Sequence, residues 1–310
     1  MAAVIPAAPA AARKRGGLRR LGRRKSTVAF LMTLPLLILI GTLVVYPTLY
    51  AIHLAMLNKS LERFVGLSNF SFLFTRETFW MVVKQSCIFA ISAVLFKAII
   101  GFCVAHFVHN VPAKGQRKWR GMLLIPWVIP PAMSTLGWFW LLDPSYSAFN
   151  WVFVRLGIPS VSWLGDADWA RFSVILVNVW YGAPFFLIMY LAALKSVPEQ
   201  LYEAAEIDGA SWWQKIRYIT LPSIRTILFV TLILQLIATA QLFTEPLLFT
   251  GGGPANSTLT VLLLIYRYAF QNSLGGEYGM AAALSIMLAA FLAVFTAGYY
   301  WLTRSWSETS

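Results

Sequence analysis

The sequence has little charge and very little cysteine. Only 12% of its 310 residues are charged and 59% are hydrophobic, whereas roughly a quarter of the residues in a soluble domain are charged. A water-soluble core of this size cannot bury so much apolar surface, so part of that surface must face lipid. The two cysteines, Cys87 and Cys103, would lie about 24 Å apart on one helix, which excludes a disulfide between them.

Motifs for nucleotide, metal or nucleophile chemistry are missing as well. No Gly-Lys pair occurs in the chain, which excludes a P-loop for ATP. The three histidines, His53, His106 and His109, do not belong to an HExxH motif and have no CxxC motif near them. We interpret His106 and His109 as interfacial residues at the end of a span rather than as metal ligands. No serine lies in a nucleophile elbow or beside a partner histidine motif. A membrane enzyme is therefore unsupported, and we expect no cofactor in this chain.

Long runs without charge predict an all-α, polytopic membrane protein with six transmembrane helices, because a spanning helix needs about 20 apolar residues. Five of the six spans contain no Lys, Arg, Asp or Glu. The remaining span, within 80–109, is interrupted by Lys84 and Lys97 but is otherwise as apolar as those five. The run 255–266 follows three glycines and a proline and is too short to span. The five runs that contain no Lys, Arg, Asp or Glu are 26–58, 121–142, 172–194, 226–244 and 278–303.

The basic residues fall on alternate sides of these spans. With the N-terminus placed in the cytoplasm, 17 of the 25 Lys and Arg residues lie on the cytoplasmic side and six on the other side. This is the positive-inside pattern, so the charge indicates topology rather than a nucleic-acid site. We expect a protein of the cytoplasmic (inner) membrane with both termini in the cytoplasm. Its predicted parts are a basic, disordered tail, 1–25, and a six-span domain, 26–310.

The basic tail followed by an apolar run also resembles a signal peptide. The run is too long for the apolar region of a signal peptide, and the Arg23-Arg24 pair is weak support for twin-arginine export. We expect the first span to remain as an anchor.

The connection between the fourth and fifth spans carries the most information. It is the segment SVPEQLYEAAEIDGASWWQKIRYITLPSIR, residues 196–225. Ser196 with Glu199, and Ser211 with Gln214, fit capping boxes, and Gly209 suits the end of a helix. The segment therefore predicts a helix, a bend and a second helix. Composition alone favours an ordinary solvated connector with its charges outward.

The spacing within this segment matches the EAA motif of ABC importer permeases. The matching positions are Glu203, Ala204, Ala205, Gly209, Ile219, Leu221 and Pro222. Three further pieces agree in order along the chain, at 123–142, 179–211 and 250–270. The chain resembles the maltose-type carbohydrate permeases of binding-protein-dependent ABC importers.

This resemblance implies the fold of an ABC type I importer permease and a role in carbohydrate or polyol uptake driven by a separate ATPase. ATP and Mg²⁺ would be bound by that ATPase. The implied partners are a second permease subunit, usually different, two copies of the ATPase and an extracytoplasmic solute-binding protein. The implied coupling loop is 196–222, with Glu203, Ala204, Ala205, Asp208, Gly209, Ile219, Leu221 and Pro222 as its contact residues.

Sugar recognition needs aromatic rings together with amide or hydroxyl groups at membrane depth. The candidates are Lys97, Asn178, Trp180, Tyr181, Gln235, Gln241 and Glu245. Polar residues between packed spans can equally join helices, and Trp180 and Tyr181 also fit an aromatic belt. A charge inside a span is costly, so we expect Lys97 to face the subunit interior or a hydrated path. A free-standing channel or secondary transporter is the alternative function, although the internal repeat common in such proteins is not evident.

Overall fold

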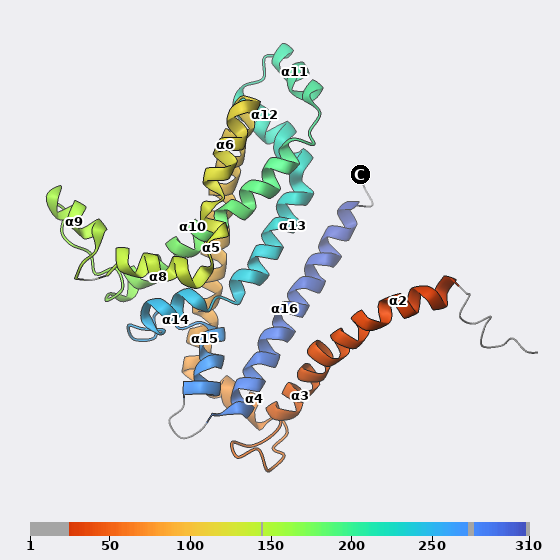
Figure 1. The fold of residues 1–310 in the computed structure, drawn as a ribbon, viewed down its shortest axis with the longest axis vertical. Helices are drawn as coiled ribbons and strands as arrows, with labels where there is room; N and C mark the ends of the chain where they lie inside the picture. Colours follow the sequence, from red (N-terminus) through yellow and green to blue (C-terminus); the bar gives the residue numbers. More distant parts are fainter. Residues whose placement is uncertain (1–24, 144, 272–275, 308–310) are drawn as a thin grey trace, which may run out of the picture. The chain divides into compact units, whose positions relative to one another are not determined.

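The computed structural model describes residues 25–143, 145–271 and 276–307, which form helices and no β-sheet beyond one isolated bridge. The predicted tail falls outside these residues, apart from Lys25. The chain divides into two units, 1–53 and 54–310. Figure 1 labels the helices, which are α2 Lys25–Ile40, η1 Gly41–Val45, α3 Tyr46–Ala55, α4 Ser68–Thr75, α5 Glu77–Asn110, α6 Ala113–Leu123, α7 Ile125–Val128, α8 Pro131–Leu141, α9 Ala148–Arg155, α10 Ala167–Leu194, α11 Glu199–Ile207, α12 Trp212–Lys215, η2 Ile216–Thr220, α13 Leu221–Ala240, α14 Thr244–Thr250, α15 Val261–Tyr266, η3 Arg267–Gln271 and α16 Tyr278–Ser307.

The first unit is one apolar rod. Helix α2, the π-turn η1 and α3 follow one another without a break. Large apolar side chains along the rod are exposed, including Leu36, Leu43 and Leu49. After Lys25 the rod is apolar all round and has no Lys, Arg, Asp or Glu, which suits lipid. The first predicted span therefore forms a helix of sufficient length.

Helices α5, α10 and α13 form the centre of the second unit (Figure 1). Ala105 and Val108, near the end of α5, share a buried cluster with Ala193 and Leu194 at the end of α10. Phe89, earlier in α5, packs in another cluster with Val174 of α10. The two helices therefore run in the same direction, and the chain between them must return across the thickness of the unit.

That return is made by a broken helix and not by the continuous span predicted at 121–142. Helix α7 is only four residues long, and the backbone is extended at Ile129 and Pro130 before α8 begins at Pro131. Proline lacks an N–H and disfavours helix in the residue before it, which explains the break. From the start of α7 to the end of α8 the stretch would rise about 25 Å as ideal helix, close to the roughly 30 Å of a hydrocarbon core.

Within the described residues, five helices are long and apolar enough to cross a membrane. They are Val28–Ala55, Glu77–Asn110, Ala167–Leu194, Trp212–Ala240 and Tyr278–Trp301. The short apolar run near 255–266 folds as Val261–Gln271, below spanning length as expected. Cys87 and Cys103 are both free thiols. The result is an all-α membrane protein with five long apolar helices and a sixth, interrupted stretch.

Candidate functional site

The predicted coupling loop folds as a helix, a bend and a second helix. Gly209, which follows α11, has φ of +73°, a left-handed conformation that glycine adopts without strain. Ser211 and Gln214 form the expected capping box at the start of α12. The box expected from Ser196 and Glu199 does not form, because Pro198 is the N-cap of α11 and the Ser196 hydroxyl donates back to the Ala193 carbonyl.

The second helix of the loop is also less independent than predicted. Helix α12 continues through the π-turn η2 into α13, giving one rod from Trp212 to Ala240. Ile219 is half-buried in η2, and Leu221 and Pro222 begin α13. The end of the loop is therefore continuous with a long apolar helix.

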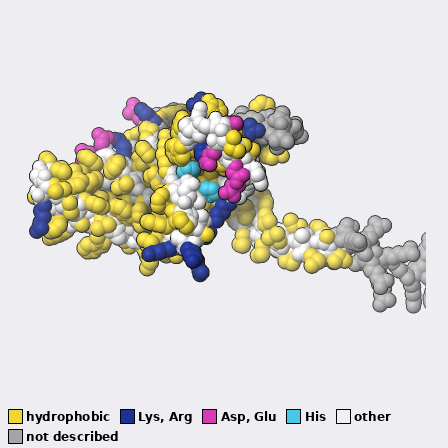
Figure 2. Space-filling view, turned by 90° about the horizontal axis from the view of Figure 1, so that it is seen from above, with side chains coloured by type: hydrophobic (Ala, Val, Ile, Leu, Met, Phe, Trp, Pro, Cys, Tyr) yellow, Lys and Arg dark blue, Asp and Glu magenta, His cyan; other side chains and the backbone are white. Residues whose placement is uncertain are grey.

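The outer face of the loop is open and partly apolar. Glu203, Ala204 and Asp208 are exposed, and Ala205 is half-buried. The Ile207 side chain is 87% exposed, next to these residues in sequence. Figure 2 looks onto this end of the molecule, where acidic and histidine side chains lie close together.

An ion pair braces the bend. Lys215 Nζ lies 2.7 Å from Glu206 Oε1 and joins α12 to α11 across Gly209. The hydrogen bond and positive charge of Lys215 hold the pKa of the Glu206 carboxyl below its usual value. At neutral pH the pair is therefore charged and closed.

Lys97 lies inside the second unit, as expected, and has partners on α13. The residue is 2% exposed, and its Nζ donates to Thr239 Oγ1 at 3.0 Å and to Gln235 Oε1 at 3.4 Å. Gly182 on α10 leaves the space for it, because a Cβ there would lie 2.5 Å from Lys97 Cε. Three helices thus meet around one ammonium group.

A second polar contact lies beside this one. Asn178 Nδ2 donates to Glu245 Oε1 at 2.8 Å, and both residues are buried. Glu245 also attracts Lys97 electrostatically. The Asn178 Oδ1 atom is buried and accepts no hydrogen bond from the described residues, which leaves an acceptor open to a hydroxyl group.

This polar cluster, defined as Lys97, Asn178, Gln235, Thr239 and Glu245, surrounds a break in the fifth span. Helix α13 ends at Ala240 and α14 begins at Thr244. Broken helices at membrane depth are tolerated where they line a cavity or a binding site. The cluster joins four of the residues predicted for the transport path.

The other predicted path residues lie apart from these contacts. Gln241 is exposed and donates to the Ile237 carbonyl of its own helix. Trp180 packs edge-on against Trp138, with ring centroids 5.5 Å apart. Tyr181 is half-buried and experiences the charge of Glu245.

Two residues of this site carry no clear signal in the sequence. Thr239 looks like any threonine in an apolar run, and Gly182 looks like any helix glycine. Lys97 is 142 residues from Thr239, and no local pattern reports a pairing over that distance.

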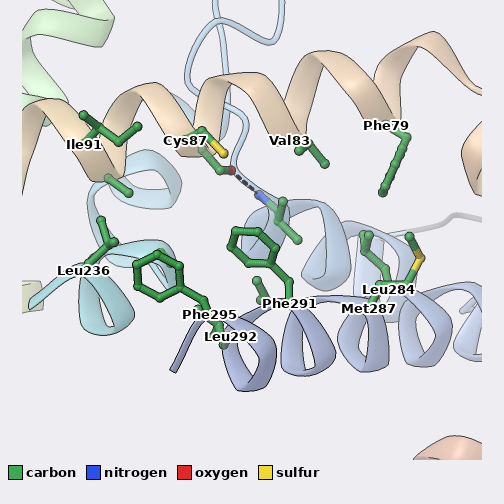
Figure 3. Close-up of a pocket in the computed structure, with 15 residues that line it drawn as sticks. Phe79, Val83, Cys87, Ile91, Leu236, Leu284, Met287, Phe291, Leu292 and Phe295 are labelled. Carbon is green, nitrogen blue, oxygen red and sulfur yellow. Dashed lines mark hydrogen bonds between the residues drawn. The ribbon is translucent and has the colours of Figure 1, made fainter. Parts of the chain in front are cut away.

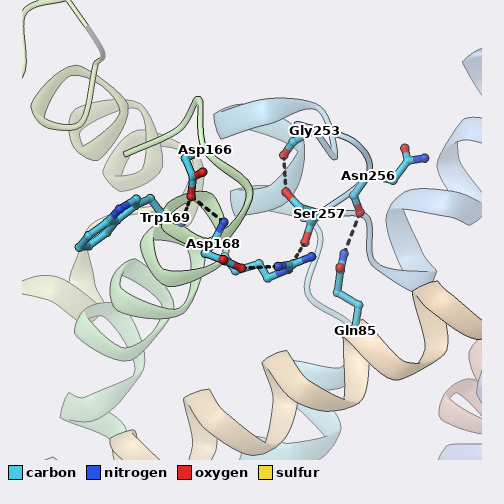
Figure 4. Close-up of polar contacts among 8 residues, drawn as sticks. Gln85, Asp166, Asp168, Trp169, Gly253, Asn256 and Ser257 are labelled. Atoms are coloured by element: carbon cyan, nitrogen blue, oxygen red, sulfur yellow. Dashed lines mark hydrogen bonds and ion pairs between the residues drawn. The ribbon is translucent and has the colours of Figure 1, made fainter. Parts of the chain in front are cut away.

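The connection between α14 and α15 is held firmly to the spans (Figure 4). Gln85 of α5 donates to the Asn256 and Leu259 carbonyls at 3.0 and 2.9 Å. Arg171 of α10 donates to the Ser257 carbonyl at 3.3 Å and pairs with Asp168. These contacts fix the end of the unit opposite the coupling loop.

A groove between α5, α13 and α16 is lined almost entirely by apolar side chains (Figure 3). Its volume is about 310 Å³, and Phe79, Leu236 and Phe291 contribute to its walls. Such a lining offers nearly nothing to solute hydroxyls. This groove is therefore a poor match for a polar solute.

Comparisons with known proteins agree with this arrangement. Residues 5–308 match the family described as binding-protein-dependent transport system inner membrane component. The trehalose/maltose transport system permease protein MalF of Thermococcus litoralis is 33% identical over 284 residues, covering 90% of this chain and 95% of that protein. The sulfoquinovosyl glycerol transport system permease protein SmoG of Agrobacterium fabrum is 30% identical, covering 90% and 91%.

Solved structures show the same fold. A crystal structure of a bacterial ABC transporter involved in the import of the acidic polysaccharide alginate aligns with a TM-score of 0.81 and 25% identity, covering 93% of this chain and 98% of that one. A second structure, of the alginate transporter with a periplasmic protein bound to an alginate pentasaccharide, aligns with a TM-score of 0.80 and 26% identity, covering 93% and 96%.

These matches define the chain as a multi-pass membrane permease with the all-α fold of ABC importers. It belongs to the family of binding-protein-dependent transport system inner membrane components. The resemblance seen in the sequence is confirmed, and the chain is a transport subunit rather than an enzyme.

Proposed function

We propose that this chain carries a carbohydrate or polyol across the cytoplasmic membrane, powered by a separate ATPase that docks on residues 196–222. The observation that carries the proposal is the exposed loop of α11, Gly209 and α12, where the family motif falls on an open surface. A second permease subunit, two ATPase copies and an extracytoplasmic binding protein complete the assembly. Both termini, α11 and α12 lie in the cytoplasm.

Docking is supported by the charge and shape of α11. The Glu203 carboxylate is exposed and can pair with a basic group of the ATPase. Ala204 and Ala205 have small side chains, which allow a second backbone to approach closely. Asp208 and Gly209 set the turn that presents this face.

The substrate class is supported by the relatives and by the polar cluster. The names of the relatives include trehalose, maltose and sulfoquinovosyl glycerol. In this chain Lys97 and Glu245 supply one positive and one negative charge, and Asn178 supplies an acceptor without a partner among the described residues. These hydrogen-bonding groups suit a solute with several hydroxyls. Trp180 and Tyr181, which follow Asn178 in α10, supply aromatic faces for its C–H surfaces.

The test is a charge reversal on the docking helix. Glu203→Lys should insert normally yet weaken ATPase association by about tenfold, because an attractive contact becomes repulsive. Glu62→Lys, a reversal at another exposed carboxylate predicted to lie outside, is the matched control. Both are measured by pull-down of the ATPase and by uptake in proteoliposomes. Full association and uptake by Glu203→Lys would leave the loop as an ordinary connector.

A further inference from the structure

The loop is tied to α5 as well as to α13. Trp212 Nε1 donates to His106 Nε2 at 3.1 Å, and the two rings meet edge to face with centroids 5.6 Å apart. Trp212 is the first residue of α12, and His106 lies near the end of α5, 106 positions earlier. This contact joins the loop to a span that does not continue from it.

The contact exists only while His106 is neutral. A ring nitrogen that accepts from the indole N–H carries no hydrogen itself, so the proton of neutral His106 is on Nδ1. That Nδ1 atom is buried and has no hydrogen-bond partner among the described residues. Protonation would place a second hydrogen between Nε2 and the indole N–H, and the two donors would repel.

Helix α5 can carry movement from this contact to the polar cluster. Lys97 lies nine residues before His106, about 14 Å along the helix at 1.5 Å per residue. Between them Gly101 packs against Phe186 of α10 so closely that a Cβ would lie 2.3 Å from the Phe186 Cβ. Because α5 is one unbroken helix over this stretch, displacement at His106 changes the tilt or register at Lys97.

We infer that the Trp212–His106 hydrogen bond is a second transmission route, by which His106 acts as a positioning residue that couples the ATPase-docking loop to Lys97 through α5. The inference rests on the proposed function, in which the ATPase moves this loop. In this view the loop drives two helices at once. Helix α13 is pushed through the chain itself, and α5 is pushed through the side-chain bond.

The bond lies beside a cavity of about 630 Å³. Polar and charged side chains form part of its wall beside His106, so water can reach the ring. The charged or titratable groups that face His106 from its own and the neighbouring elements are His109, Lys195, Glu199, Tyr202, Glu206 and Lys215. Glu206 and Lys215 already neutralise one another. Among His106 and these groups, only His106 is itself a partner in the bond to Trp212, so we assign the acid sensitivity of the contact to His106.

The test compares two adjacent tryptophans in the reconstituted complex. Trp212 and Trp213 are each 60% exposed, and Trp212 makes the bond to His106. Trp212→Phe should lower the substrate transported per ATP hydrolysed by about threefold or more, the loss expected for one hydrogen bond. Trp213→Phe changes the neighbouring indole of the same docking segment, so its loss measures the effect of altering that surface, and the loss in Trp212→Phe should exceed it. Equal coupling in the two variants would overturn the inference.

His106 provides the second half of the test. His106→Gln keeps an acceptor within reach of the indole and should retain coupling, whereas His106→Leu should lose as much as Trp212→Phe, with no further loss in the double variant. Between about pH 8 and pH 5, the range over which histidine titrates, wild-type coupling should fall and that of His106→Gln should not. A parallel fall in both, or additive losses in the double variant, would contradict the inference.

ATPase pull-down separates this inference from the proposed function. If the wild-type chain binds no ATPase, the proposed function is wrong, and the amount of substrate transported per ATP hydrolysed cannot be defined. If the wild type binds and transports, the variants decide the transmission route alone. If Trp212→Phe itself loses the ATPase, His106→Leu decides, because its substitution lies outside the loop.

Discussion

At the scale of single residues, Gly182 and Lys97 depend on one another. Gly182→Ala would place a methyl group within 2.9 Å of Lys97 Nζ and closer still to Cδ and Cε. The lysine must then move away from Thr239 and Gln235. We expect uptake to fall at least about tenfold, because a charge-assisted hydrogen bond is worth roughly 1.5 kcal/mol or more. Uptake and membrane insertion are measured in parallel.

Gly137→Ala is the control for that experiment, because nothing lies within 4 Å of a Cβ at Gly137. Both variants add one methyl group to a helix. If Gly182→Ala transports as well as Gly137→Ala, the position of Lys97 has no bearing on the path, and Lys97 is a packing residue only.

Asn178 and Gln235 test whether the polar cluster contacts the solute. Asn178→Ala and Gln235→Ala should each raise the substrate concentration needed for half-maximal uptake by about fivefold, the effect of losing one hydrogen bond. Gln241→Ala removes an amide that bonds to its own helix and should change little. Poor assembly of the first two variants with unchanged substrate dependence would mark them as helix contacts.

At the scale of elements, the bend at Gly209 sets the angle between α11 and α12. Valine there must adopt a positive φ, which costs about 1 kcal/mol or more. Gly209→Val should therefore insert normally but bind ATPase less tightly or hydrolyse ATP without transport. Gly157→Val is the matched control, because Gly157 also has a positive φ, +76°, and open space around it. This variant should leave coupling intact. Equal behaviour of the two variants would show that backbone strain alone is responsible.

Local chemistry explains which elements the sequence predicts correctly. Gly209 and the Ser211–Gln214 box act within a few residues of their partners, so a short window contains all the information. The Ser196–Glu199 box fails because the intervening Pro198 takes the N-cap position. The predicted span at 121–142 is broken where adjacent prolines interrupt its hydrogen bonds.

Contacts between distant segments are beyond such local reasoning. The sequence indicates that Lys97 needs a polar environment but not that Thr239 and Gln235 provide it. The same holds for Trp212 and His106. In the sequence they resemble interfacial aromatic residues, and only the folded structure shows that the loop lies against α5 and joins them. Both contacts form because α5 packs against α10 and α13 in the folded chain.

At the scale of the whole molecule, the number of crossings depends on the stretch from α7 to α8. Because α5 and α10 run in the same direction, the chain between them must return to the opposite end of the unit. We therefore expect this stretch to cross the bilayer despite its break. The alternative is a re-entrant segment, which would leave the residues before and after it on the same side.

Cysteine labelling of intact cells measures this directly. With Cys87 and Cys103 replaced by alanine, Ser160→Cys should react with an impermeant maleimide from outside, whereas Lys118→Cys should react only after the membrane is opened. Glu203→Cys in the coupling loop should behave like Lys118→Cys, since positive charge gathers on the cytoplasmic side. Labelling of Ser160→Cys and Lys118→Cys from the same side would show that α7 and α8 do not cross the membrane.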